Sequence, residues 1–173
     1  APERGDLMMK ATLIMEERKE ELSKLETSEM GKVLAETRGD VQEGIDTGYF
    51  GAGESRRMHG QTVPSEMPNK FAMITRNALG VCGMITPWNF PMAICCGMTV
   101  AALVTGNSVI VKPAGQTTGI AKLICDMLWE AGAPRDVLHY AAGPGAIVGS
   151  ALVRDPRVSI IAFTGSKAVG LDI

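Results

Sequence analysis

The chain has 173 residues, of which 46% are hydrophobic and 21% charged, which is enough for one sizeable core and short for two complete domains. Its net charge is −2. Residues 1–57 hold 13 acidic and 9 basic side chains, and residues 58–173 hold 6 acidic and 8 basic ones, so neither part is basic enough to suggest a nucleic-acid partner. The longest apolar run, residues 90–105, is too short and too rich in small residues to cross a membrane, and no apolar stretch follows a basic start, so we expect a cytoplasmic protein.

Residues 1–57 are predicted to form a helical segment. Apolar residues recur at helical spacing among charged ones from Pro2 to about Met30, which predicts one amphipathic helix with Gly31 near its end. A second helix is predicted for residues 34–57, although each of its five glycines weakens it by about 1 kcal/mol relative to alanine. Three of its residues share an apolar face: Val41, Ile45 and Tyr49.

Residues 58–85 are predicted to be a connector followed by a pair of strands. Residues 58–70 follow neither the helical nor the strand period and contain two prolines, which indicates an extended connection. The runs Phe71–Arg76 and Leu79–Ile85 are strand-like and are joined around Asn77. We therefore expect a hairpin or two neighbouring strands here.

Residues 86–173 alternate between apolar strands and helical patterns. The expected strands are Ser108–Val111, Val137–Ala141 and Val158–Phe163, and the expected helices are Pro91–Val104, Thr117–Ala131 and Ala146–Val153. This βαβ repetition predicts an α/β fold, a Rossmann-like parallel sheet with helices on both faces. Right-handed crossovers bring the carboxyl ends of the strands to one edge, where the loops hold most polar and glycine residues of this part.

The four cysteines, Cys82, Cys95, Cys96 and Cys125, show no spacing that pairs ligands for zinc. Adjacent Cys95 and Cys96 are also poorly placed to bond to each other. We expect reduced, mostly buried thiols and no metal.

Three motifs carry a resemblance to one enzyme family. The segment Pro87-Trp88-Asn89-Phe90-Pro91, after a strand ending in Ile85-Thr86, resembles the Pro-Trp-Asn-Phe-Pro motif of the aldehyde dehydrogenase superfamily. Val111-Lys112-Pro113-Ala114 is similar to the family's lysine motif, and Phe163-Thr164-Gly165-Ser166 with Gly170 to its cofactor turn. Their order and spacing fit, and Leu25-Glu26-Thr27 with Gly31-Lys32 looks like the family's N-terminal helix. The resemblance thus covers essentially the whole chain and implies an incomplete aldehyde dehydrogenase fold.

Asn89 is the candidate catalytic residue. Its side chain offers N–H donors on a rigid loop, as needed to stabilise the oxyanion formed when a nucleophile adds to a carbonyl. From the residues alone, an asparagine that closes a turn is the favoured alternative, and the resemblance implies the catalytic role.

The resemblance also implies a binding site for NADP or NAD. Lys112 is either a surface cation or a fixed charge that meets a ribose hydroxyl or a phosphate. Gly165-Ser166 is either a pyrophosphate site at a helix start or a simple turn with a serine cap. The structural alternative for Trp88 is a core aromatic, and the structural alternative for Gly145 is a turn. The implied cofactor contacts are Ile85, Thr86, Pro87, Trp88, Lys112, Pro113, Ala114, Gly115, Gly145, Phe163, Thr164, Gly165, Ser166 and Val169.

Gly115 departs from the pattern of many NAD-preferring members, which have a glutamate at the third position after the motif lysine. A carboxylate there repels a 2′-phosphate, whereas glycine removes the charge and leaves room beside Lys112. We therefore expect NADP to be accepted.

In the family, the nucleophilic cysteine and the glutamate that activates water both lie after the Phe-Thr-Gly-Ser turn, and this sequence ends seven residues beyond Ser166. None of its four cysteines is expected to be the nucleophile. We expect part of an oxidoreductase that converts an aldehyde, such as a semialdehyde, to a carboxylic acid, with the chain alone inactive and the catalytic domain absent.

Two other functions stay open. One is a noncatalytic dinucleotide-binding or structural protein, and the other is an acyl-phosphate or acyl-CoA reductase of the same superfamily. Family habit implies a dimer or tetramer, with the strands in Phe71–Ile85 as a candidate contact between copies.

Overall fold

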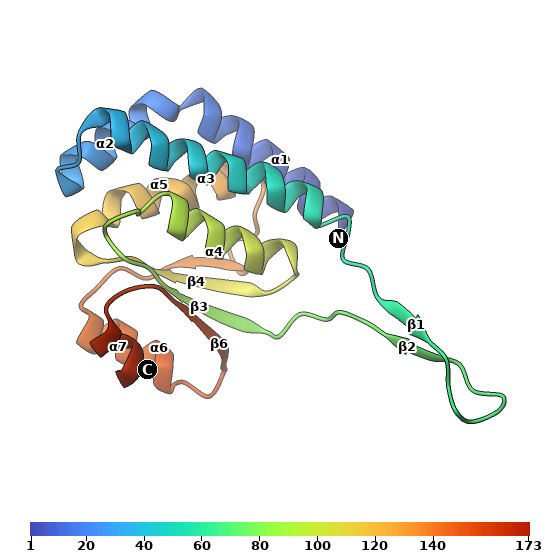
Figure 1. Cartoon of the computed structure of the whole chain (residues 1–173). Coiled ribbons are helices and arrows are strands. Elements are labelled where there is room, and N and C mark those ends of the chain that lie inside the picture. Colours follow the sequence, from blue (N-terminus) through green and yellow to red (C-terminus); the bar gives the residue numbers. More distant parts are fainter.

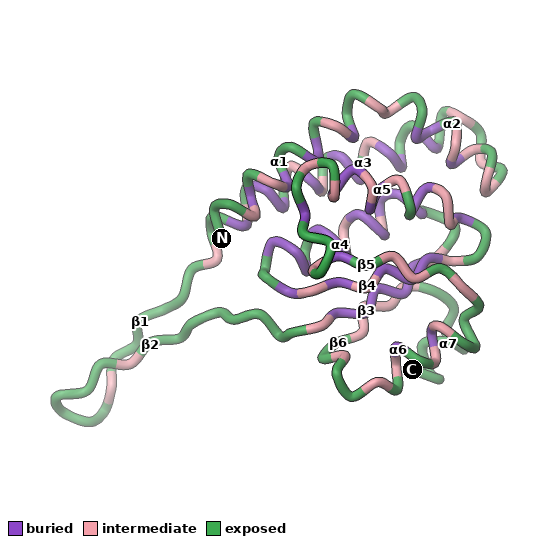
Figure 2. The backbone as a smooth tube through the Cα atoms, turned by 180° about the vertical axis from the view of Figure 1, so that it is seen from behind, coloured by how far each residue is buried: buried purple, intermediate pink, exposed green.

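The computed structural model describes residues 1–173 and stacks helices and one sheet in layers. Three helices, α1 (Pro2–Glu17), α2 (Lys19–Met30) and α3 (Leu34–Glu54), form an outer layer. Below it lie α4 (Ala93–Val104) and α5 (Thr118–Glu130), which contact both the outer helices and the sheet (Figure 1). The buried residues concentrate between these layers (Figure 2). None of the helices is both long enough and apolar enough to cross a membrane.

The sheet has four parallel strands in the order β5-β4-β3-β6. Their bounds are β3 (Val81–Ile85), β4 (Ser108–Lys112), β5 (Leu138–Tyr140) and β6 (Val158–Phe163). Helices α6 (Ser150–Arg154) and α7 (Lys167–Asp172) lie on the face opposite to α4 and α5 (Figure 1). The predicted α/β fold, a Rossmann-like parallel sheet with helices on both faces, is confirmed.

Two predicted helices are divided in the structure. The single N-terminal helix is interrupted at Arg18 (φ −97°, ψ 11°), which separates α1 from α2. Both halves remain on the core because Met8, Met15 and Leu22 are all fully buried. The helix predicted for residues 146–153 is a π-helical turn, η2 (Gly145–Gly149), followed by α6.

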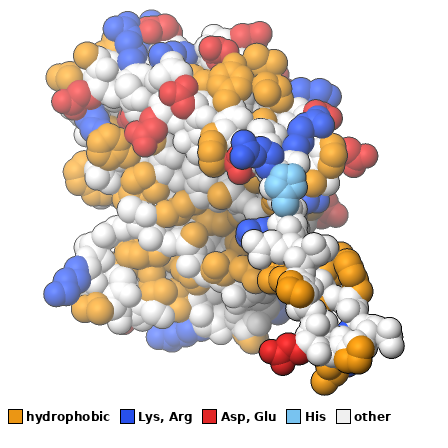
Figure 3. Space-filling view, turned by 45° about the vertical axis from the view of Figure 1, so that its right-hand side comes forward, with side chains coloured by type: hydrophobic (Ala, Val, Ile, Leu, Met, Phe, Trp, Pro, Cys, Tyr) orange, Lys and Arg blue, Asp and Glu red, His pale blue; other side chains and the backbone are white.

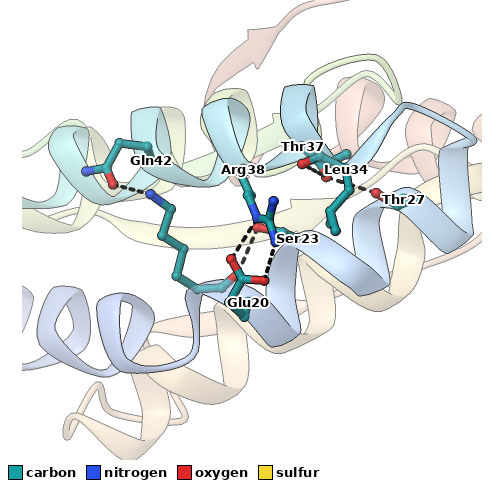
Figure 4. Close-up of polar contacts among 8 residues, drawn as sticks. Glu20, Ser23, Thr27, Leu34, Thr37, Arg38 and Gln42 are labelled. Carbon is teal, nitrogen blue, oxygen red and sulfur yellow. Dashed lines mark hydrogen bonds and ion pairs between the residues drawn. The ribbon is translucent and has the colours of Figure 1, made fainter.

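Polar contacts join α2 to α3, some exposed and some partly buried (Figure 4). Both guanidinium nitrogens Nε and Nη2 of Arg38 donate to Glu20, at 2.7 and 2.9 Å. The hydroxyl groups of Thr27 and Thr37 lie 2.9 Å apart. Because the ion pair is exposed, water screens it and it contributes little to stability. Between the two helices, Gly31 has φ 79°, a left-handed conformation that ends α2 where the glycine predicted it.

In the projecting arm of residues 58–80 the strands pair differently from the prediction. Strand β1 (Gln61–Val63) pairs antiparallel with β2 (Ala72–Ile74), so the connector itself supplies a strand. The run from Leu79 onward does not pair with β2, because β3 lies at the centre of the parallel sheet, between β4 and β6. There Cys82 and Met84 are buried, whereas β2 is largely exposed.

The arm extends away from the layers (Figures 1 and 2), and apolar side chains gather along it (Figure 3). Six of them are more than a third exposed: Val63, Met67, Phe71, Met73, Ile74 and Leu79.

Three glycines of α3 allow the outer helices to approach closely. A Cβ atom on Gly44 would lie 2.9 Å from Cγ of Met92, and one on Gly51 would collide with Val100 of α4. A Cβ on Gly48 would collide with Oγ1 of Thr12 in α1. These glycines reduce helix propensity and permit the contacts of α3 with α1 and α4.

Two alanine substitutions in α3 are expected to have opposite effects on stability. Gly48→Ala overpacks the α1–α3 contact and should cost about 1–3 kcal/mol. Gly39→Ala, where an added Cβ meets nothing within 4 Å, should stabilise the chain by about 0.5–1 kcal/mol. Urea denaturation of the 173-residue chain measures both values. Equal stability of the two variants would show that α1 and α3 do not pack this closely.

Candidate functional site

The predicted site residues meet at the carboxyl edge of the sheet. Ile85 is the register partner of Lys112 on one side and of Phe163 on the other. The strand ends are joined further by backbone hydrogen bonds, in which Thr86 donates to the carbonyl of Lys112 and Thr164 to that of Ile85, each at 3.2 Å. Three motifs that lie up to 78 residues apart in sequence, counted from Ile85 to Phe163, therefore become neighbours.

This edge is also the point where the strand order reverses. The chain passes from β3 outward to β4 and β5, and then crosses back to place β6 on the other side of β3. Ligands of open α/β sheets bind in the crevice beyond the strands at such a point. A cavity of about 460 Å³ lies here, and its lining includes Ile85, Lys112, Gly145 and Val169.

Lys112 ends β4 with only 6% of its surface exposed. Its Nζ donates to the carbonyl of Pro113 at 2.8 Å, and burial lowers the pKa of the amine. A lysine amine has three N–H donors, so Lys112 can also meet an anionic or hydroxyl group in the cavity. The alternative of an ordinary surface cation is wrong. The next residues, Pro113 and Ala114, are buried and half-buried, and exposed Gly115 opens the 3₁₀ turn η1 (Gly115–Thr117).

Two glycines that follow β6 lie close to the Phe163 ring. A Cβ on Gly165 would lie 2.6 Å from Cζ of the Phe163 ring, and one on Gly170 would lie 3.1 Å from Cε1. Oγ of Ser166 accepts a hydrogen bond from the Val169 backbone at 3.4 Å, so this serine caps α7. The helix start predicted at Gly165-Ser166 is confirmed.

The loop after β3 presents its large side chains to solvent. Thr86 is buried and Pro87 is half-buried, whereas Trp88, Asn89 and Phe90 are exposed, Trp88 by 50%. Trp88 is therefore not a core aromatic. Asn89 is therefore accessible to solvent, on a loop whose two prolines restrict φ.

Comparison with known proteins matches the whole chain, residues 1–173, to the family model described as "Aldehyde dehydrogenase family". The chain belongs to the aldehyde dehydrogenase family. It is 42% identical over 97% of its length to "Alpha-ketoglutaric semialdehyde dehydrogenase" of Bacillus subtilis (strain 168), of which it covers 34%. It is 44% identical over 98% of its length to "1-pyrroline-5-carboxylate dehydrogenase" of Geobacillus thermodenitrificans (strain NG80-2), of which it covers 33%.

Among solved structures, an NAD-dependent aldehyde dehydrogenase from Sinorhizobium meliloti superposes with a TM-score of 0.96 at 36% identity. The superposition covers 99% of this chain and 34% of that one. The chain thus spans about a third of the length of the relatives it matches.

Two carboxylates of this aldehyde dehydrogenase chain, which the sequence analysis missed, hold the helices that follow the site loops. Asp40 accepts from the backbone N–H groups of Met92 and Ala93 at the start of α4, at 3.4 and 3.0 Å. Glu29 accepts from Gly119 and Ile120 at the start of α5, at 2.7 and 2.9 Å. Neither carboxylate is near in sequence to the helix that it caps, so no local capping pattern could reveal it.

The four cysteines are buried and unpaired, as expected. Burial raises the pKa of Cys95 to about 12, and also that of Cys96 to about 12. The same cause raises the pKa of Cys125. A nucleophile requires a thiolate, which these surroundings disfavour.

Behind the loop that follows β3, Glu26 is fully buried and neither of its carboxyl oxygens accepts a hydrogen bond. Burial, together with the nearby carboxylate of Asp40, raises the pKa of Glu26 to about 9. At neutral pH Glu26 is therefore a neutral acid.

This protonation predicts a pH dependence of stability. Below about pH 4.5 Glu26 is protonated in both folded and unfolded chains, and between 4.5 and about 9 unfolding releases its proton. The free energy of unfolding therefore falls as the pH rises through that window, by at most about 1.4 kcal/mol per pH unit. Glu26→Gln, which is neutral at every pH, should become progressively more stable than the wild type between pH 5 and pH 8.

Urea denaturation at several pH values measures this difference. The exposed Glu36→Gln substitution on α3 is the control, and its curve should run parallel to that of the wild type. Parallel curves for Glu26→Gln and the wild type would show that Glu26 ionises normally.

Proposed function

We propose that this chain forms the cofactor-binding and oxyanion-stabilising part of an NAD(P)-dependent aldehyde dehydrogenase. The proposal rests chiefly on one observation, the juxtaposition of Ile85, Lys112 and Phe163 at the switch point of the sheet. The exposed Asn89 lies on the loop that follows Ile85. The relatives named above are aldehyde dehydrogenases, and the matched solved structure is described as NAD-dependent.

The residues present fit a dinucleotide. Lys112 supplies a positive charge in the lining of the cavity of about 460 Å³, a volume within the usual range for small-molecule sites. Gly115, where an added Cβ would meet nothing within 4 Å, leaves open space at the start of η1, three residues after Lys112. Other candidate contacts are Thr86, Pro87, Trp88, Pro113, Ala114, Gly145, Thr164, Gly165, Ser166 and Val169.

The bound NAD(P) supplies the hydride acceptor of the reaction. The contribution of this chain is to hold that cofactor with Lys112 and the turn at Gly165, and to donate N–H groups of Asn89 to the oxygen of the aldehyde as it gains negative charge. The nucleophile comes from outside residues 1–173, since the four thiols here are buried.

We propose a semialdehyde as the substrate, because the names of the relatives at 42% and 44% identity refer to a semialdehyde and to pyrroline-5-carboxylate. We further propose a cytoplasmic homo-oligomer, a dimer or tetramer, in which the apolar arm of residues 58–80 contacts another copy. The six exposed apolar side chains of the arm support this contact.

Cofactor binding by the 173-residue chain is testable through its tryptophan fluorescence. NADP or NAD should give saturable quenching, since Trp88 is half-exposed at the edge of the site. Lys112→Met keeps the length of the side chain and removes its charge, so affinity should fall roughly tenfold or more. Lys10→Met, an exposed lysine of α1, should bind like the wild type. A folded chain that responds to neither cofactor would contradict the proposed binding role.

Cofactor choice is testable at Gly115. Gly115→Glu restores a carboxylate that fits the open space, and repulsion of the 2′-phosphate should weaken NADP binding about tenfold or more while NAD binding is kept. Gly115→Gln has the same shape without the charge and should retain NADP binding within about threefold. Equal losses in the two variants would show that size decides, and a strong NAD preference of the wild type would contradict acceptance of NADP.

A further inference from the structure

A lysine in the connection between α2 and α3 touches the backbone of the candidate catalytic residue. Nζ of Lys32 donates to the main-chain carbonyl of Asn89 at 2.6 Å. The same amine lies 3.4 Å from the centroid of the Phe90 ring, in cation–π contact. One charged group thus holds two consecutive residues of the loop that follows β3, across 57 positions of sequence.

The surroundings of this contact explain why the loop needs it. Asn89 and Phe90 are exposed, so neither is held by burial in the core. The prolines at 87 and 91 have no N–H group, so they cannot donate the backbone hydrogen bonds that would otherwise tie the loop down. Beyond the loop, Asp40 anchors the chain at Met92 and Ala93.

The amine is itself placed by the outer helices. Its positive charge lies near buried Glu26 of α2, where it partly offsets the rise in the pKa of that carboxyl group. Gly31, in its left-handed conformation, turns the chain from α2 into the connection at this point. The outer helical layer therefore reaches the loop at two places, through a cation at Asn89 and through a carboxylate at the start of α4.

We propose that Lys32 is a positioning residue that orients the carboxamide of Asn89 for oxyanion stabilisation, an inference that rests on the function proposed above. Fixing the carbonyl of Asn89 fixes the peptide plane between residues 89 and 90 and so restricts the backbone from which the Asn89 side chain leaves. Preorganised donors stabilise a developing oxyanion because they need not reorient during the reaction. The ordinary alternative is a surface lysine whose removal changes nothing local.

The first experiment measures the order of the loop in the 173-residue chain, independently of any activity. Labelling with 5-fluorotryptophan gives two ¹⁹F signals, Trp88 beside Asn89 and Trp129 in α5, where the indole donates to the carbonyl of Leu138. In Lys32→Met the Trp88 signal should shift and change in width, while the Trp129 signal stays in place. Lys32→Arg, which can donate and stack, should restore the wild-type signal. Lys24→Met, an exposed lysine of α2, is the matched control.

The second experiment measures kinetics in the enzyme that contains this chain. Lys32→Met should lower kcat on the order of tenfold with KM for the aldehyde changed less than twofold, and Lys32→Arg should recover most of the loss. An unchanged Trp88 signal, or equal changes at Trp88 and Trp129, would overturn the positioning role. Unchanged kcat with a disturbed Trp88 signal would overturn the catalytic part alone. A wild-type enzyme with no aldehyde oxidation would instead overturn the proposed function, and the catalytic role of Lys32 with it.

Discussion

The arrangement of this chain depends on two carboxylates that reach from the outer helices to the starts of α4 and α5. The first turn of a helix leaves backbone N–H groups without partners, and a carboxylate there gains both hydrogen bonds and a favourable interaction with the helix dipole. Asp40 serves α4 and Glu29 serves α5. Each helix start follows a site loop, so the outer layer determines where the loops of Asn89 and of Lys112 return into the fold.

The second organising feature is the parallel register of β3 with both of its neighbours. A parallel sheet places every strand end at one edge, and the reversal of strand order at β3 leaves a crevice there. Burial of Lys112 at the end of β4 makes its charge a fixed feature of that crevice. The exposed loop that follows β3 gains its order from side chains of other elements. Lys32 belongs to this support, and it links the outer helices directly to the backbone of Asn89.

Close packing of α3 shows a conflict between local preference and the tertiary structure. By helix propensity, the five glycines of α3 weaken the helix, and the sequence supports only that conclusion. In the structure Gly44, Gly48 and Gly51 face Met92, Thr12 and Val100 at distances that no Cβ could occupy. The helix forms because packing against α1 and α4 offsets its weak local preference. The arm shows the converse. The two strand-like runs joined around Asn77 were expected to be neighbours, but β2 pairs with β1, and β3 is buried between β4 and β6.

By itself the sequence determined the α/β class, the alternation of strands and helices after residue 86, the motifs of the site and the family. These follow from local periodicity and from short segments whose residue order is distinctive. Only the tertiary structure decided the break at Arg18, the pairing of β1 with β2, and the partners of Glu26, Asp40 and Lys32. Those partners lie between 14 and 57 positions apart in the sequence. Which distant groups meet depends on how whole layers pack, and a local pattern contains no information about that packing.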